Sequence, residues 1–148
     1  MRVLVLGGTG LISTPMIDQL CDQGHEPILF NRGETPSRST ADVETIHGDR
    51  NDFDGFEAAV AELNPDVVID MLTFESYPAE NAVSVFKNST IKHYLFCSST
   101  AVYGPLSQIP ADESEAHTPS GQYGRNKSEA EHVFVRALQN DQFPVTIL

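Results

Sequence analysis

Short apolar runs alternate with stretches of helically spaced apolar residues along the chain. The apolar runs predict six strands, at residues 3–6, 27–30, 43–47, 66–71, 93–97 and 145–148. The helical spacings predict helices at residues 12–23, 53–63, 79–87 and 123–138. Because strands that alternate with helices form parallel sheets, we predict an α/β fold, a doubly wound parallel sheet with helices on both faces. The stretch 103–122 is expected to be a functional or mobile loop.

The length of the chain fits a single domain. Its 148 residues are close to the usual size of one folded unit, so one domain over residues 1–148 is predicted. The last predicted strand, 145–148, is followed by no cap, turn or tail. Natural domains seldom end inside an apolar strand, and we therefore expect the chain to be the N-terminal part of a longer protein.

Charge and composition exclude several classes of protein. Nine lysines and arginines against 21 aspartates and glutamates give a net charge of −12, which disfavours binding to nucleic acid. Two cysteines make no disulfide scaffold, and the five histidines show no metal-ligand spacing, so no metal site is predicted. No apolar stretch reaches the ~18 residues of a membrane span, and the first apolar run is too short for a secretory signal. These features favour a cytoplasmic protein with no membrane partner.

A glycine-rich loop, Gly7-Gly8-Thr9-Gly10, lies between the first predicted strand and the first predicted helix. Glycines allow a tight turn and let a pyrophosphate approach backbone N–H groups, and the helix N-terminus adds a partial positive charge. An ordinary strand–helix turn would look similar, but the place of the loop in a strand–helix–strand unit favours a Rossmann-type dinucleotide site. Ser13 stands where a third glycine is usual, and a slight splaying of the helix is expected there.

The residues after the second and third strands bear on which dinucleotide would bind. Asn31 carries no charge that would repel a phosphate, and the Arg32 guanidinium can form a forked contact with one. NADP is therefore favoured over NAD, which stays the alternative. Asp49 can accept a hydrogen bond from an adenine amino group or form a turn. Arg50 would either stack on the adenine or be exposed to solvent, and the sequence favours neither.

A tyrosine and a lysine, Tyr123 and Lys127, stand four residues apart at the start of the last predicted helix. This spacing places both side chains on one face of the helix. A phenol has an ordinary pKa near 10, and a nearby ammonium group favours the phenolate, which makes the pair suitable for general acid–base chemistry. Three hydroxyl residues, Ser98, Ser99 and Thr100, follow the fifth strand, where doubly wound sheets bind ligands. Position alone does not choose among the three.

These motifs together resemble the extended short-chain dehydrogenases/reductases, the NAD-dependent epimerase/dehydratase family. Residues 7–12 match its cofactor loop, which adds Leu11 and Ile12 to the expected cofactor-binding residues. Residues 99–104 resemble its Ser/Thr-x-x-Val-Tyr-Gly segment, whose first hydroxyl selects Ser99. Tyr123 and Lys127 match its Tyr-x-x-x-Lys pair.

The resemblance implies roles for these residues. Tyr123 would be the general acid/base, Lys127 would anchor the nicotinamide ribose and tune the tyrosine, and Ser99 would polarise the substrate. It implies an NAD(P)-dependent epimerase, dehydratase or reductase, with a nucleotide sugar as the expected substrate and a homodimer as one assembly. The C-terminal region that completes the substrate pocket in this family is absent, so the chain alone is expected to be inactive.

Two other functions are weighed against an enzyme. The first is a non-catalytic dinucleotide-binding sensor or scaffold, which would have no need of Ser99, Tyr123 and Lys127 together. The second rests on residues 30–33 and 48–50, which resemble a branch that includes the chloroplast stem-loop-binding-like proteins, some of them linked to RNA. The intact tyrosine–lysine pair and the net charge of −12 make RNA binding the less favoured function.

The end of the fourth predicted strand departs from the small residues that are usual in the family. Met71 and Leu72 would line the nicotinamide side of the site or pack in the core. Asp70, directly before them, has no role that the sequence indicates.

Overall fold

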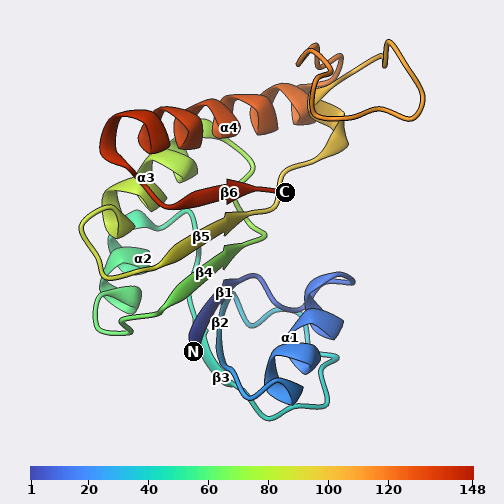
Figure 1. Cartoon of the computed structure of the whole chain (residues 1–148). Helices are drawn as coiled ribbons and strands as arrows, with labels where there is room; N and C mark the ends of the chain where they lie inside the picture. Colours follow the sequence, from blue (N-terminus) through green and yellow to red (C-terminus); the bar gives the residue numbers. More distant parts are fainter.

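The computed structural model describes residues 1–148 as a six-stranded parallel sheet with helices on both faces (Figure 1). The elements in chain order are β1 (Arg2–Leu6), α1 (Ser13–Asp22), β2 (Glu26–Asn31), β3 (Glu44–His47), α2 (Phe53–Val60), β4 (Val67–Asp70), α3 (Ser76–Phe86), β5 (His93–Phe96), the 3₁₀ turn η1 (Thr100–Val102), α4 (Gln122–Asp141) and β6 (Val145–Ile147). The predicted doubly wound, Rossmann-type fold is confirmed.

The strand order is β3-β2-β1-β4-β5-β6, and every neighbouring pair is parallel. The order reverses between β1 and β4, which is the switch point where such sheets bind ligands. Leu6 pairs with both Phe30 and Asp70, and Asp70 pairs with Phe96, so these strands end at the same edge of the sheet. The residues that follow β1, β2, β4 and β5 therefore lie side by side along this edge.

The two faces of the sheet carry unequal helical layers. Helices α2, α3 and α4 cover one face, where 17 buried residues form the main core. The rings of Tyr94, Phe96, Phe134 and Phe143 meet there at centroid distances of 4.7–6.3 Å. On the other face lies α1 (Figure 1), whose Ile17 packs with four buried residues of the sheet in a second, smaller cluster. The main core thus lies directly beneath the carboxyl ends of β4 and β5.

The helix ends differ from the sequence prediction by several residues. Helix α3 begins at Ser76, three residues early, and its Pro78 sits in the first turn, where a proline is tolerated. Helix α2 ends at Val60, three residues before the predicted end, and Asn64 follows with a positive φ of 44°. Helix α4 continues to Asp141. No helix is both long and apolar enough to cross a membrane.

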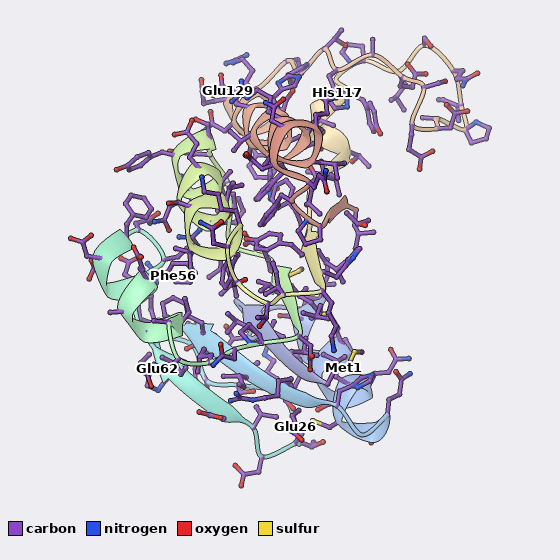
Figure 2. All side chains as sticks on the ribbon, turned by 60° about the vertical axis from the view of Figure 1, so that its left-hand side comes forward. Met1, Glu26, Phe56, Glu62, His117 and Glu129 are labelled. Carbon is purple, nitrogen blue, oxygen red and sulfur yellow. The ribbon has the colours of Figure 1, made fainter.

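The long segment between η1 and α4 contains no regular element, as the sequence predicts. It projects beyond the N-terminal end of α4 (Figure 1). It returns to the body of the protein at His117, which lies beside α4 (Figure 2), and its Nδ1 is 3.5 Å from a carboxylate oxygen of Glu131. The Thr118 hydroxyl donates to the backbone oxygen of Tyr103, at 2.7 Å. The two ends of the loop are therefore joined to each other and to α4.

Helix α4 can approach η1 closely because its first turn carries Gly124. A Cβ atom at this position would lie 2.3 Å from the backbone oxygen of Ala101 in η1, well inside van der Waals contact. The backbone that carries Ser99 is thereby held against the turn that carries Tyr123. Gly121, at the start of the same helix, has no atom within 4 Å of such a Cβ.

We expect Gly124→Ala to push η1 away from α4. The overlap should lower the free energy of unfolding by about 1–3 kcal/mol, despite the ~1 kcal/mol that alanine gains in helix propensity. Urea denaturation measures the loss. The matched control, Gly121→Ala, should change stability by less than about 1 kcal/mol, as expected for a change of N-cap residue. Equal effects of the two substitutions would contradict the close contact.

Candidate functional site

The loop between β1 and α1 leaves backbone donors free at the carboxyl edge of the sheet. Gly7 and Gly8 have φ of +113° and +99°, and a side chain at Gly7 would meet the Met71 Cβ at 3.2 Å. No side chain caps α1, and the N–H groups of Leu11 and Ile12 donate to no protein acceptor. These donors and the positive end of the helix dipole suit an anion such as a pyrophosphate.

Ser13, which stands where a third glycine is usual, is built into the turn at the start of α1. Its side chain is buried, and its Oγ accepts a hydrogen bond from the Gly10 N–H at 3.0 Å. Thr14 adds a hydrogen bond from its hydroxyl to the Gly10 oxygen, at 2.8 Å. The hydroxyl of Ser13 therefore holds the loop together where a glycine would only save space.

A pocket of about 460 Å³ opens beside this loop. Its wall is formed by residues that follow β1, β2, β3 and β4 and by the first turn of α3: Gly7, Thr9, Asn31, Arg32, Gly33, Glu34, Thr35, Gly48, Asp49, Arg50, Asn51, Leu72, Phe74, Glu75 and Pro78. The cofactor-binding residues predicted from the sequence are divided by this wall. It includes Gly7, Thr9, Asn31, Arg32, Asp49, Arg50 and Leu72, whereas Gly10, Leu11, Ile12, Met71, Tyr123 and Lys127 lie outside it.

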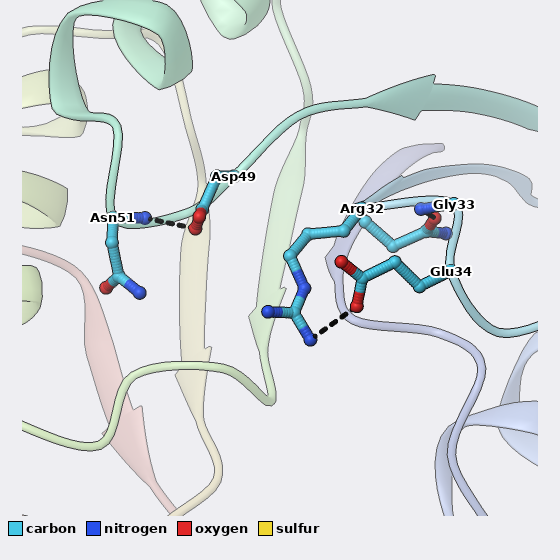
Figure 3. Close-up of polar contacts among 6 residues, drawn as sticks. Arg32, Gly33, Glu34, Asp49 and Asn51 are labelled. Atoms are coloured by element: carbon cyan, nitrogen blue, oxygen red, sulfur yellow. Dashed lines mark hydrogen bonds and ion pairs between the residues drawn. The ribbon is translucent and has the colours of Figure 1, made fainter.

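The end of β2 presents a charged pair to the pocket. The Arg32 guanidinium forms an ion pair of 2.9 Å with the Glu34 carboxylate, and about two-thirds of each side chain is exposed (Figure 3). Asn31 turns its amide oxygen back to the Gly33 N–H, at 2.8 Å. Sequence reasoning missed Glu34, although its position two residues after Arg32 was the available signal. An exposed pair of this kind is weak, so Arg32 is free to exchange partners.

Arg50 does not extend into solvent, so that alternative from the sequence is wrong, whereas stacking on an adenine stays a prediction. The residue is buried, and its guanidinium donates to Asn81 Oδ1 at 2.8 Å and to the Pro78 oxygen at 2.7 Å. It lies 4.0 Å from the centre of the Phe56 ring. Arg50 thus connects the segment after β3 to α2 and α3, and it also lines the pocket.

Two aspartates between β3 and α2, Asp49 and Asp52, make different contacts. Asp52 caps α2 by accepting from the Gly55 N–H at 3.1 Å. Asp49, which lines the pocket, accepts from the Asn51 N–H at 2.9 Å through one oxygen (Figure 3), and its second oxygen has no hydrogen-bond partner in the protein. This is an Asx turn that keeps an acceptor available for a ligand.

The lysine of the predicted pair is an internal residue. Lys127 is 2% exposed, and its Nζ donates to the backbone oxygens of Thr73, at 2.8 Å, and Cys97, at 2.7 Å. Its ammonium group also lies 4.8 Å from the Phe74 ring centre and 4.6 Å from that of Phe96. Burial lowers the pKa of Lys127, and the nearby Asp70 opposes that shift most strongly.

The tyrosine of the pair lies at the surface, one turn before the lysine. Tyr123 is half exposed, and its ring centre is 6.2 Å from that of Phe74. Because Phe74 also lines the pocket, a single ring adjoins the pocket, Tyr123 and Lys127. Sequence reasoning missed Phe74, for which an aromatic residue just after a strand end was the available signal.

The three hydroxyl residues after β5 are separated by their contacts. Ser98 donates to Glu131 on α4 in a short hydrogen bond, and Thr100 is exposed. Ser99 accepts from the Ala101 N–H at 3.2 Å, which caps η1 and leaves its own hydroxyl hydrogen free to donate. Ser99 is therefore the member of the three that caps η1, the turn that contacts Gly124 of α4 through the Ala101 oxygen.

Comparison with known proteins identifies the family of the chain. The model of the NAD dependent epimerase/dehydratase family matches residues 3–148. The 2'-dehydrokanamycin reductase of Streptomyces kanamyceticus is 29% identical over 95% of this chain and 39% of its own length. The UDP-glucose 4-epimerase of Streptococcus mutans is 29% identical over 86% of the chain and 44% of its own length. The chloroplast stem-loop binding protein of 41 kDa b of Arabidopsis thaliana is 27% identical over 88% and 37%.

Solved structures share the fold. UDP-glucose 4-epimerase from Brucella ovis in complex with NAD superposes with a TM-score of 0.88 at 23% identity, covering 99% of this chain and 50% of that one. The Bordetella bronchiseptica enzyme WbmG in complex with NAD and UDP gives 0.83 at 21% identity, over 99% and 52%. The chain thus spans about half the length, or less, of the proteins it matches. Its fold and the family match over residues 3–148 place the chain in the NAD dependent epimerase/dehydratase family.

Proposed function

We propose that this chain is the dinucleotide-binding part of an NAD(P)-dependent epimerase, dehydratase or reductase that acts on a nucleotide sugar or a related hydroxyl or keto substrate. The observation that carries the proposal is the position of Phe74, whose ring adjoins the pocket, Tyr123 and Lys127. A ligand that fills the pocket along β1 would reach the acid–base pair at that ring.

The residues around the pocket fit a dinucleotide. The free N–H groups of Leu11 and Ile12 would receive the pyrophosphate at the start of α1, and the free oxygen of Asp49 would accept from the adenine amino group. Leu72 would give an apolar surface beside the loop, and Met71 would support Gly7 from behind. A bound nicotinamide dinucleotide supplies the acceptor and donor of hydride.

The chain's own residues would move the proton and hold the substrate. Lys127 keeps a positive charge close to the ribose side of the site, with one Nζ hydrogen left after its two carbonyl contacts. Tyr123 would transfer a proton at its phenolic oxygen, and the free hydroxyl hydrogen of Ser99 would donate to the substrate oxygen. The relatives named UDP-glucose 4-epimerase and the neighbour in complex with UDP support a nucleotide sugar as the substrate class.

The proposal includes a preference for NADP. Arg32 and Arg50 are the two cations of the pocket wall, and Arg50 is already engaged by Asn81 and Pro78. Arg32 is held only by the exposed carboxylate of Glu34 and can turn to a 2′-phosphate. Glu34 would compete with that phosphate for Arg32, so the strength of the preference depends on both residues.

We expect Arg32→Ala to weaken NADPH binding about tenfold, the size expected for the loss of one charge-assisted contact. NADH binding should be nearly unchanged. Glu34→Gln should strengthen NADPH binding several-fold, because it frees the guanidinium. Titration of each variant, followed by nicotinamide fluorescence, measures the affinities. Equal affinity for both cofactors that neither substitution alters would rule out the NADP preference.

We expect Tyr123→Phe to lower turnover by at least about 100-fold, as for the loss of a general acid/base, while cofactor affinity stays within twofold of the wild type. Turnover is measured in the full-length protein that contains this chain, with UDP-glucose as the probe substrate, as conversion of the sugar or net change of the dinucleotide. Tyr77→Phe, which removes another exposed phenol, on α3, is the matched control and should be neutral. Loss of cofactor binding in Tyr123→Phe would show that the tyrosine is structural.

A further inference from the structure

A buried carboxylate with no part in the function proposed above lies beneath the pocket. Asp70 is the last residue of β4, at the switch point of the sheet, and is fully buried. Oδ1 accepts from the N–H groups of Leu72 and Thr73, both at 2.9 Å. Oδ2 accepts from the Thr73 hydroxyl at 2.6 Å and from the Tyr94 hydroxyl at 2.5 Å. All four contacts are donors, as an ionised carboxylate requires.

One of these contacts fixes the carboxylate to the main core. Tyr94 comes from the neighbouring strand β5, and its ring packs against Phe86, Phe134 and Phe143 at centroid distances of 5.3–5.8 Å. Burial, together with the negative charge of Asp70, raises the pKa of the Tyr94 phenol well above its usual range. The phenol is therefore held in its protonated form, as a donor to Asp70 must be.

The other three contacts fix the backbone that follows β4. Leu72 and Thr73 are bound through their N–H groups, and Thr73 also through its hydroxyl, so the turn after Asp70 closes on the carboxylate. This turn directs the Thr73 carbonyl to Lys127 Nζ at 2.8 Å and brings the Phe74 ring to 4.8 Å from the same ammonium. Asp70 is thus connected to Lys127 through one residue.

We propose that Asp70 is a positioning residue for Lys127: anchored by Tyr94, it orders the turn at residues 71–74 so that the Thr73 carbonyl and the Phe74 ring hold the ammonium group at the cofactor pocket. The proposal deepens the function given above and rests on it for the consequence in cofactor binding. The contacts among Asp70, Thr73 and Lys127 are the geometric basis.

The charge of Asp70 supports the same role. The ionisable groups that face Lys127 come from three elements: Asp70 at the end of β4, Cys97 after β5, and Glu131 one turn further along α4. The Glu131 carboxylate is already engaged by the Ser98 hydroxyl and lies 3.5 Å from His117 Nδ1. Of the three, Asp70 acts most strongly against the lowering of the Lys127 pKa that burial causes. Asp70 therefore both aims the ammonium group and favours its charged form.

The experiment follows the protonation of Lys127 directly. The sequence contains three lysines, Lys87, Lys92 and Lys127, so their Cε resonances can be resolved in one NMR titration and assigned with Lys127→Arg. In Asp70→Asn we expect the Lys127 midpoint to fall by about one pH unit, since a nearby opposite charge is lost. NADPH affinity should fall about tenfold. An unchanged Lys127 midpoint in folded Asp70→Asn protein overturns the proposal.

The matched control is Asp66→Asn. Asp66 lies at the opposite end of the same strand and forms its ion pair with Lys92, at 2.7 Å. This substitution should alter the Lys92 resonance and leave that of Lys127 in place. A shift of the Lys127 midpoint equal to that in Asp70→Asn would show that any loss of negative charge has this effect, and it would overturn the proposal.

Thr73 provides a second test that holds even where Asp70→Asn fails to fold. Thr73→Val keeps the shape of the buried side chain but removes the donor to Asp70, and Thr73→Ser keeps the donor. We expect Thr73→Val to displace the Lys127 resonance and weaken NADPH several-fold, and Thr73→Ser to recover both values. Identical behaviour of Val and Ser variants would overturn the proposal.

The two readouts separate this proposal from the proposed function. If substitution of Asp70 or Thr73 shifts the Lys127 titration midpoint but the protein binds no dinucleotide, the positioning role is supported and the proposed cofactor is contradicted. If the protein binds NADPH but the Lys127 resonance is the same in the wild type and in the Asp70 and Thr73 variants, the cofactor is supported and the positioning role is overturned.

Discussion

The site depends on how a buried ammonium group is held between the ends of two strands. Lys127 donates to the carbonyls of Thr73 and Cys97, which follow β4 and β5, and it stands between the rings of Phe74 and Phe96. Burying an ammonium group costs free energy unless its hydrogens have hydrogen-bond acceptors. The carbonyls of Thr73 and Cys97 are these acceptors. Because both must contact Lys127, they fix α4, the ends of β4 and β5 and the pocket wall relative to one another.

The alternation of apolar runs and helical spacings was sufficient to predict the sheet, because every buried strand leaves an apolar run and every helix here buries one stripe. The helix limits were less accessible. Helix α3 begins at Ser76 because proline is compatible with a first turn, and the spacing of apolar residues does not report that turn. The position of η1 depended on a contact between Gly124 and Ala101, residues 23 apart, which no local pattern records.

Sequence position indicated which residues follow the strands, but it could not reveal contacts that depend on other elements of the fold. Two arginines illustrate the difference. Arg32 follows β2 and is exposed at the pocket, whereas Arg50 follows β3 and is buried among Asn81, Pro78 and Phe56. Asp70 gave no signal because its donors come from β5 and from the turn that it orders. Such roles become visible only when the partners from other elements are in place.

If the pocket at the carboxyl edge of β1, β2 and β3 binds a nicotinamide dinucleotide, as we propose, NADPH should change the backbone amide chemical shifts around it. The shifts are mapped in the ¹⁵N-labelled chain as NADPH is added. We expect saturable shifts in three segments, at residues 7–12, 31–34 and 48–50, together with Phe74. Shifts that are absent at millimolar NADPH, or that fall on other parts of the chain, would contradict this proposal.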